Sequence, residues 1–173
     1  MNDSDMEFIE GIINTQKDNH KILTEIRTAS RARIIWNVGI AGFALLNAKP
    51  YWEALADKPV TGANIALLSL PWVLSMLFGV IAYFLIDETM KKETMFFVTL
   101  FNAFDLFKID MEEKRKIDVN KFRQINKGED PSVNPARKEM LKWGKWARRF
   151  ELTTFLFLVL GFIWSAIAPL FLC

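Results

Sequence analysis

Residues 59–86, PVTGANIALLSLPWVLSMLFGVIAYFLI, contain no charged side chain. An α-helix rises about 1.5 Å per residue, and about 20 apolar residues are enough to cross the roughly 30 Å hydrocarbon core of a bilayer. This stretch is therefore long enough to span a membrane as a helix. Because two further apolar stretches lie on either side of it in the chain, it predicts an all-α, polytopic membrane protein.

The two neighbouring stretches differ in length. Residues 152–173 are also free of charged side chains and are expected to form another span. Residues 34–48, IIWNVGIAGFALLNA, give only about 22 Å of helix. If the helix continues through residues 49–52, with Arg33 and Lys49 extending their charged ends to the interface, this segment also spans. The sequence thus predicts three spanning helices and a cytoplasmic helical layer.

The composition fits this division. The chain has 173 residues, of which 51% are hydrophobic and 24% are charged, and the two kinds are segregated along the sequence. A formal net charge of +2 gives no reason to expect nucleic-acid binding. The N-terminus lacks the basic region and short apolar core of a cleavable signal peptide. The single cysteine, Cys173, excludes an internal disulfide and a cysteine-based metal site.

Basic residues near the spans predict the topology, since lysine and arginine gather on the cytoplasmic side. The loop 49–63 offers only two of them, whereas the opposite side has many: Arg27, Arg31, Arg33, Lys91, Lys92, Lys142, Lys145, Arg148 and Arg149. We therefore expect a bacterial inner-membrane protein with a cytoplasmic N-terminus and a periplasmic C-terminus. Trp36, Trp143 and Trp146 lie beside these charges and are expected to form an interfacial aromatic belt.

The expected organisation has four parts. Residues 1–33 form a cytoplasmic amphipathic helix, and no proline or glycine after Gly11 prevents it from continuing into the membrane. Residues 34–86 form a two-span hairpin. Residues 87–149 form a cytoplasmic helical segment with a loop at 125–135. Residues 150–173 form the third transmembrane helix.

A cluster of phenylalanines follows the second span. Phe97, Phe101, Phe104 and Phe107 fall on one side of a helix, next to charged residues that take the chain into water. The favoured interpretation is a packing stripe in a cytoplasmic bundle, against Ile9, Ile12, Leu23 and Ile26 of the same or a neighbouring chain. A helix in the membrane interface is the second interpretation. A re-entrant crossing is the third, and it is disfavoured by the cost of Asn102, Asp105 and Lys108 in lipid.

The first span has one face of small and polar residues, which are Arg33, Asn37, Ala41, Ala44, Asn47 and Ala48. One interpretation is a close seam between helices, in which small residues let backbones approach and asparagines form hydrogen bonds. The other is a polar passage surrounded by copies of this face, with Arg33 as a cationic ring at its cytoplasmic mouth. The other spans carry small residues at helical spacing, which favour oligomerisation or tight packing within the chain. Pro71 frees a carbonyl in the second span that needs a neighbouring donor.

No pattern predicts an enzyme. The lone histidine, His20, has no histidine or cysteine partner for a metal site. The sequence contains neither a Gly-rich phosphate loop nor a Gly-x-Ser-x-Gly elbow. We therefore expect no catalytic, cofactor-binding or metal-binding residues.

One family has a similar order of parts. An amphipathic helix ending in RTASRARIIWN (27–37), a two-span hairpin and a helix after FLIDETMKK (84–92) resemble the SLATT effector domains of bacterial conflict systems, over about residues 4–116. The third span departs from their two-span pattern. The resemblance implies an antiphage effector that forms a pore when a companion sensor triggers it.

The expected function is a homo-oligomeric gated pore, ion channel or membrane-perturbing effector controlled through its cytoplasmic helices. The alternative is a non-conducting anchor or scaffold that recruits a soluble partner. The expected partners are membrane lipid, further copies of the chain and a soluble cytoplasmic protein or signal, without nucleic acid.

Overall fold

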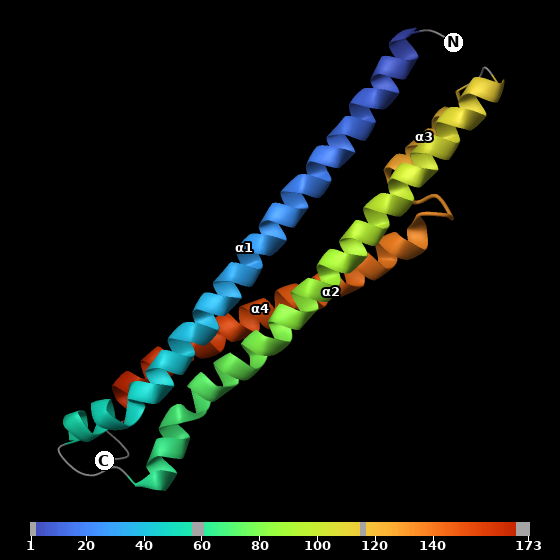
Figure 1. Ribbon diagram of the computed structural model, residues 1–173. Coiled ribbons are helices and arrows are strands. Elements are labelled where there is room, and N and C mark those ends of the chain that lie inside the picture. Colours follow the sequence, from blue (N-terminus) through green and yellow to red (C-terminus); the bar gives the residue numbers. More distant parts are fainter. Residues whose placement is uncertain (1–2, 57–60, 115–116, 169–173) are drawn as a thin grey trace. The chain divides into compact units, whose positions relative to one another are not determined.

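The computed structural model describes residues 3–56, 61–114 and 117–168, and all regular secondary structure within these ranges is helical (Figure 1). The chain runs through α1 (Asp3–Ala56), α2 (Gly62–Lys114), α3 (Val119–Asn126) and α4 (Asn134–Ile167). The all-α prediction is confirmed. The expected continuation of the N-terminal helix is also present, because α1 passes residue 33 and includes Pro50 without a break.

Two of the helices, α2 and α4, are long and apolar enough to cross a membrane. Only 33% of the most apolar window of α2 and 17% of that of α4 are buried inside the chain, unlike the core helix of a soluble protein. The expected first span within α1 does not reach the same hydropathy, because its uncharged run is short and holds two asparagines. It stays a prediction, and residues 169–173 of the expected third span lie outside the described residues.

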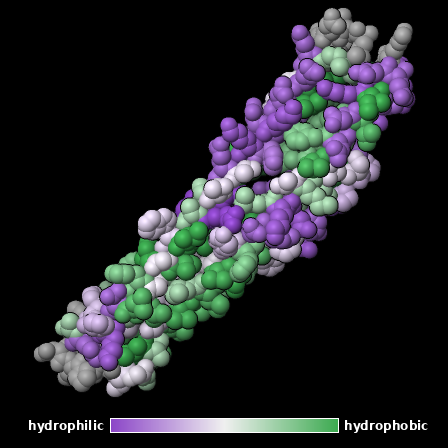
Figure 2. Space-filling model, viewed as in Figure 1, coloured by the Kyte–Doolittle hydropathy of each residue, from purple (hydrophilic) through white to green (hydrophobic). Residues whose placement is uncertain are grey.

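The chain divides into two compact units. Unit 1 comprises Met1–Thr28 and Asp87–Lys145, and unit 2 comprises Ala29–Ile86 and Trp146–Cys173. These boundaries fall within five residues of those expected from charge patterning. On the face shown in Figure 2, hydrophobic side chains make up most of the surface of unit 2, whereas hydrophilic side chains predominate on unit 1.

Unit 1 is held together by a phenylalanine-rich core. Phe97, Phe104 and Phe107 are buried, and Phe101 is half-buried at the edge of the same cluster. The partners include Ile9 and Ile13 of α1, Phe122 and Ile125 of α3, and Val133. The stripe therefore packs within its own chain. Ile26 does not join it, because its side chain is 49% exposed.

The connection between α2 and α4 is more ordered than the sequence predicted. Part of the expected loop 125–135 belongs to α3, whose N-cap Asp118 accepts a hydrogen bond from the Lys121 backbone N–H. The turn that follows places Gly128 at a φ of 65°. This left-handed conformation favours glycine. An aspartate before a short helix is a recognisable N-cap, so Asp118 was the sequence signal for α3.

Small residues let the helices of unit 2 approach closely. A Cβ added to Gly79 of α2 would lie 2.3 Å from Val38 Cγ2 of α1. A Cβ added to Gly161 of α4 would lie 2.9 Å from the Trp72 ring of α2. Of the two possibilities for these small-residue patterns, the structure shows tight packing within the chain.

Pro71 interrupts the backbone hydrogen bonds of α2, because proline has no N–H to donate to the carbonyl of Leu67. Trp164 Nε1 of α4 donates to that carbonyl oxygen at 3.2 Å. The prediction that the freed carbonyl needs a neighbour is confirmed. The bond fixes α4 against α2 at this level of unit 2.

Candidate functional site

The polar face of α1 lies along one side of its contact with the rest of unit 2. Ala41 and Ala48 are buried, at 0% and 4% exposure, with Ala41 in a cluster that includes Trp72 and Leu158. Asn37 and Ala44 are half-buried. Arg33 and Asn47 are exposed. Ala41 and Ala48 therefore pack against the other helices of unit 2. The polar members of the face lie at the edge of this contact.

Most polar side chains in the interior of unit 2 have a partner. Ser75 Oγ donates to the Thr154 carbonyl oxygen at 3.2 Å, and Trp72 Nε1 donates to Ser165 Oγ at 3.0 Å. Asn47 Nδ2 donates to the Phe43 carbonyl oxygen of its own helix at 2.8 Å. Within the described part of the chain, the side-chain amide of Asn37 forms no hydrogen bond. On the face of small and polar residues on α1, Asn37 is therefore the asparagine that has no hydrogen-bond partner in that part of the chain.

Arg33 is held at the end of this face. Its Nη2 atom is 2.9 Å from Glu151 Oε1 of α4 and donates to Ser30 Oγ at 2.9 Å. The Arg33 side chain is 65% exposed, so this ion pair is accessible to solvent and weak by itself. The two contacts orient the guanidinium at the edge of the bundle, where it remains available to a further anion.

Unit 1 contains a buried ion pair that the sequence analysis did not identify. Arg27 donates from Nε and Nη2 to Glu93 Oε1 at 2.9 and 2.7 Å. The side chains are 20% and 5% exposed. Glu93 lies in the charge-rich run DETMKKET (87–94), whose spacing gave no indication that one carboxylate is buried. Only the packing of α1 against α2 distinguishes Glu93 from the other carboxylates of this run.

Two polar side chains of α1 enter the phenylalanine core of unit 1. The ring centroid of His20 lies 4.4 Å from that of Phe97, and its Nδ1 atom is buried without a hydrogen-bond partner. Gln16 Nε2 donates to Asn126 Oδ1 of α3 at 2.8 Å. His20 is thus a polar interruption of the apolar face that α1 packs into this core.

The tryptophans of the expected aromatic belt differ in surroundings. Trp36 is 72% exposed and Trp146 is 46% exposed, and the guanidinium of Arg149 lies 5.3 Å from the centroid of the Trp146 ring. Trp143 is half-buried in unit 1 and donates from Nε1 to Glu139 Oε2 at 3.2 Å. Exposed tryptophans beside arginine suit a membrane interface.

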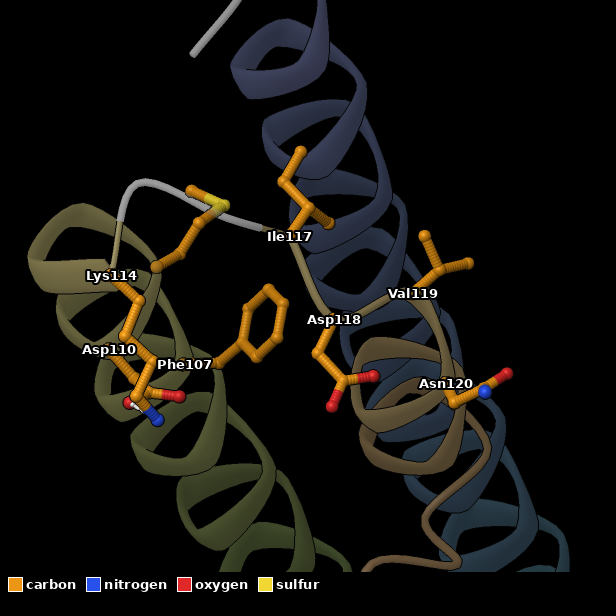
Figure 3. A pocket seen from close by; sticks show the side chains of 8 residues that line it. Phe107, Asp110, Lys114, Ile117, Asp118, Val119 and Asn120 are labelled. Carbon is orange, nitrogen blue, oxygen red and sulfur yellow. Dashed lines mark ion pairs between the residues drawn. The ribbon is translucent and has the colours of Figure 1, made fainter.

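A pocket of about 550 Å³ lies where α2 leads into α3 (Figure 3). Its charged groups serve the local structure, since Asp110 pairs with Lys114 and Lys121. The hydrogen bond from Lys114 lowers the pKa of Asp110, and the same bond raises the pKa of Lys114. In residues 3–56, 61–114 and 117–168, no group of three or more histidine, cysteine, aspartate or glutamate side chains is arranged to hold a metal ion.

Comparison with protein-family models, curated proteins and solved structures found no match to this chain. The functional interpretation therefore depends on the geometry of the two units.

Proposed function

We propose that this chain is a subunit of a homo-oligomeric bacterial inner-membrane pore, gated through unit 1 and serving as an effector in antiphage defence. In this proposal α1, α2 and α4 cross the membrane through unit 2, and unit 1 lies in the cytoplasm. The open edge of the α1 face, with Arg33, Asn37, Ala44 and Asn47, meets the same edge of neighbouring copies. The defence role depends on the resemblance to SLATT effectors.

The observation that carries the proposal is the unpaired amide of Asn37. A polar group left without a hydrogen bond in hydrocarbon costs several kcal/mol by the usual estimates. Asn37 is half-buried and lies about one turn inside the expected span, which begins at residue 34, and it is therefore expected to find a partner outside its own chain. A neighbouring copy or the water of a passage would supply that partner, and each fits an oligomer built around this face.

The shared helices support control through unit 1. Both α1 and α2 supply residues to unit 1 and to unit 2. A signal bound by the cytoplasmic part would therefore act on the same helices that carry the polar face.

Flux through liposomes tests the proposal. The purified chain should release a trapped ion or dye, and Asn37→Leu should abolish release while the oligomer keeps its mass. Asn14→Leu makes the same chemical change at an exposed position of α1 in unit 1 and should leave release unchanged. Release by Asn37→Leu at the parental rate from an intact oligomer would remove Asn37 from the conducting path.

A second candidate function, a non-conducting scaffold that recruits a soluble protein, is favoured by one surface of unit 1. Met95, Val98, Leu106 and Ile109 project from one side of α2 and are 53–68% exposed. Apolar side chains at helical spacing suit a partner helix. A parent chain that releases no dye but co-purifies with a stoichiometric soluble protein, lost in Leu106→Lys, would favour the scaffold over the pore.

A further inference from the structure

A pocket with aromatic walls lies between α1, α2 and α4 in unit 2. It has a volume of about 330 Å³. Four aromatic side chains line it, which are Tyr51 and Trp52 of α1, Trp72 of α2 and Phe162 of α4. Alanines at positions 44, 48 and 166 also line it and leave the space between the rings open. Ligand pockets have volumes of roughly 300–1,000 Å³, so this one suits a ligand of about one ring.

Contacts within unit 2 hold two of these walls in place. Trp72 Nε1 donates to Ser165 Oγ at 3.0 Å, and the Trp72 and Phe162 rings meet edge to face with their centroids 4.9 Å apart. Trp52 is 1% exposed and packs in a cluster with Leu68. Aromatic rings pack favourably on one another in stacked and edge-to-face arrangements. Walls of this kind therefore favour a planar, aromatic-sized ligand.

One polar atom of the lining has no partner. Trp52 Nε1 is buried, and nothing in residues 3–56, 61–114 and 117–168 accepts a hydrogen bond from it. An indole N–H can only donate, and a buried donor without an acceptor is costly. Asn47, Tyr51 and Ser165 add further polar groups to the same lining. The pocket therefore favours a ligand that carries acceptor oxygens.

The lining is also uncharged. Among the described residues, no lysine, arginine, histidine, aspartate or glutamate lines the pocket. Two charged residues follow closely on α1, but Lys49 Nζ and Glu53 Oε1 pair with each other at 3.9 Å. An ion in the pocket would lose water without gaining a counter-charge, which is unfavourable. The ligand is therefore expected to be neutral.

We propose that this pocket binds the ring of a lipid-soluble quinone, with one carbonyl oxygen accepting a hydrogen bond from Trp52 Nε1. A quinone ring is planar and neutral, and it carries two carbonyl acceptors. It therefore matches the aromatic walls, the uncharged lining and the unpaired N–H. Reaching Nε1 requires a small shift of the wall, which Tyr51 permits because it is 51% exposed. The inference goes beyond the proposed pore and shares with it the membrane location of unit 2.

A lipid acyl chain is a less suitable occupant. It has no ring to pack on the aromatic walls and no acceptor for Trp52. Two matched probes separate these occupants. Duroquinone is a tetramethyl ring with two carbonyl oxygens, and durene is the tetramethyl ring without them.

The first measurement is the Tm of the full chain in detergent with each probe. We expect duroquinone to raise Tm saturably, by roughly 5–10 °C at about 100 times its Kd for a chain of this size. Durene should leave Tm nearly unchanged. An equal shift with durene would overturn the quinone site and assign the pocket to hydrocarbon chains in general.

A second measurement removes the donor alone. Trp52→Phe keeps an aromatic ring and should weaken duroquinone binding about tenfold, because one hydrogen bond to an otherwise unpaired donor is lost. Trp36→Phe is the matched control. It makes the same change at a side chain that is 72% exposed and does not line the pocket, so Kd should stay the same. Parental affinity in Trp52→Phe would overturn the proposed contact.

A third measurement fills the pocket from its exposed edge. Ala166→Trp should abolish the duroquinone shift, whereas Ala66→Trp, at an exposed alanine of α2 that does not line the pocket, should keep it. If Ala166→Trp changes the oligomer mass and leaves the duroquinone Kd unchanged, the pocket is a contact between copies and the quinone site is overturned.

Recovery in the membrane fraction and Tm without a probe are measured first for every variant. A parent chain found in the soluble fraction would refute the membrane location and, with it, a lipid-soluble ligand. A membrane-integrated parent that shows no saturable shift with duroquinone would overturn the quinone site alone. Neither result depends on ion flux, so the pore proposal is tested separately.

Discussion

Removing Arg27 should destabilise unit 1 more than any other loss of a single charge in the ion pairs described above. The Glu93 side chain is only 5% exposed, and both hydrogen bonds from Arg27 reach the same carboxylate oxygen. In Arg27→Met the carboxylate remains buried without its cation. Gly144 packs beside the guanidinium, where an added Cβ would lie 3.3 Å from Arg27 Nη2, so little space is left for water to replace it.

The expected magnitude follows from the unequal burial of the two partners. Breaking a fully buried pair by removing one member costs about 3–5 kcal/mol, and the 20% exposure of Arg27 places the loss at the lower end, about 3 kcal/mol. Glu93→Leu should cost less, about 1–2 kcal/mol, because the arginine left behind can reach water with its charged end. The double variant Arg27→Met/Glu93→Leu should lie within about 1 kcal/mol of the parent, since no buried charge remains.

Hydrogen exchange with mass spectrometry in detergent measures these differences, because it reports the opening free energy of each segment. Amides of residues 20–28 and 89–97 should exchange much faster in Arg27→Met than in the double variant. Lys108→Met is the matched control, since it breaks an ion pair with Glu10, whose side chain is 58% exposed, and should cost well under 1 kcal/mol. If the double variant instead loses as much opening free energy as the two single variants together, the energies of Arg27 and Glu93 are independent. The reasoning from a buried ion pair would then be refuted.

Three further predictions follow from the packing and charges. Gly79→Ala should separate α1 from α2 and lower Tm, and Val38→Ala should restore part of the loss by removing the methyl group that the new Cβ would strike. Gly128→Ala should cost about 1–2 kcal/mol in the unfolding of unit 1, because φ is 65° and the new Cβ would lie 2.9 Å from an arginine side chain. Because its folded pKa is lowered by Lys114, Asp110 stabilises the fold above its unfolded pKa of about 3.9, and this contribution is lost as pH falls below that value. When Tm is measured over a series of pH values, Asp110→Asn should reduce the loss of Tm at acidic pH. An unchanged fall of Tm at acidic pH in this variant would show that the Asp110–Lys114 pair contributes nothing to stability.

Local patterns predicted much of the helical architecture. The uncharged runs 59–86 and 152–173 predicted α2 and α4 as potential spans, because length and hydropathy are properties of a continuous segment. The absence of breakers after Gly11 predicted that α1 would continue through its polar and apolar parts. Pro71 predicted a donor near the freed carbonyl, although the sequence did not name Trp164. The helix α3 was missed, because its eight residues are too few to show a period.

The candidate sites were harder to predict, because they form through contacts between residues that are far apart in the sequence. Sequence periodicity placed Asn37, Ala41 and Ala48 on one face of α1, but only the packing of α4 and α2 separates the buried alanines from the unpaired asparagine. Arg27 and Glu93 are 66 residues apart in the sequence. The residues next to each of them in the sequence do not distinguish either one from a solvent-exposed charge. Arg31 and Tyr83 are 52 residues apart and meet only when α1 lies against α2.

The sequence by itself determined that this chain forms long helices and which of their segments are apolar enough for lipid, since those properties depend on residues close together in the chain. It also predicted the phenylalanine stripe, because helical spacing fixes which side chains share a face. Only the tertiary structure decided what each face meets: the stripe packs on α1 and α3, and Glu93 is buried beside Arg27. Burial and hydrogen bonding are set by the close approach of helices far apart in sequence, and glycines such as Gly79 permit that approach without identifying the partner.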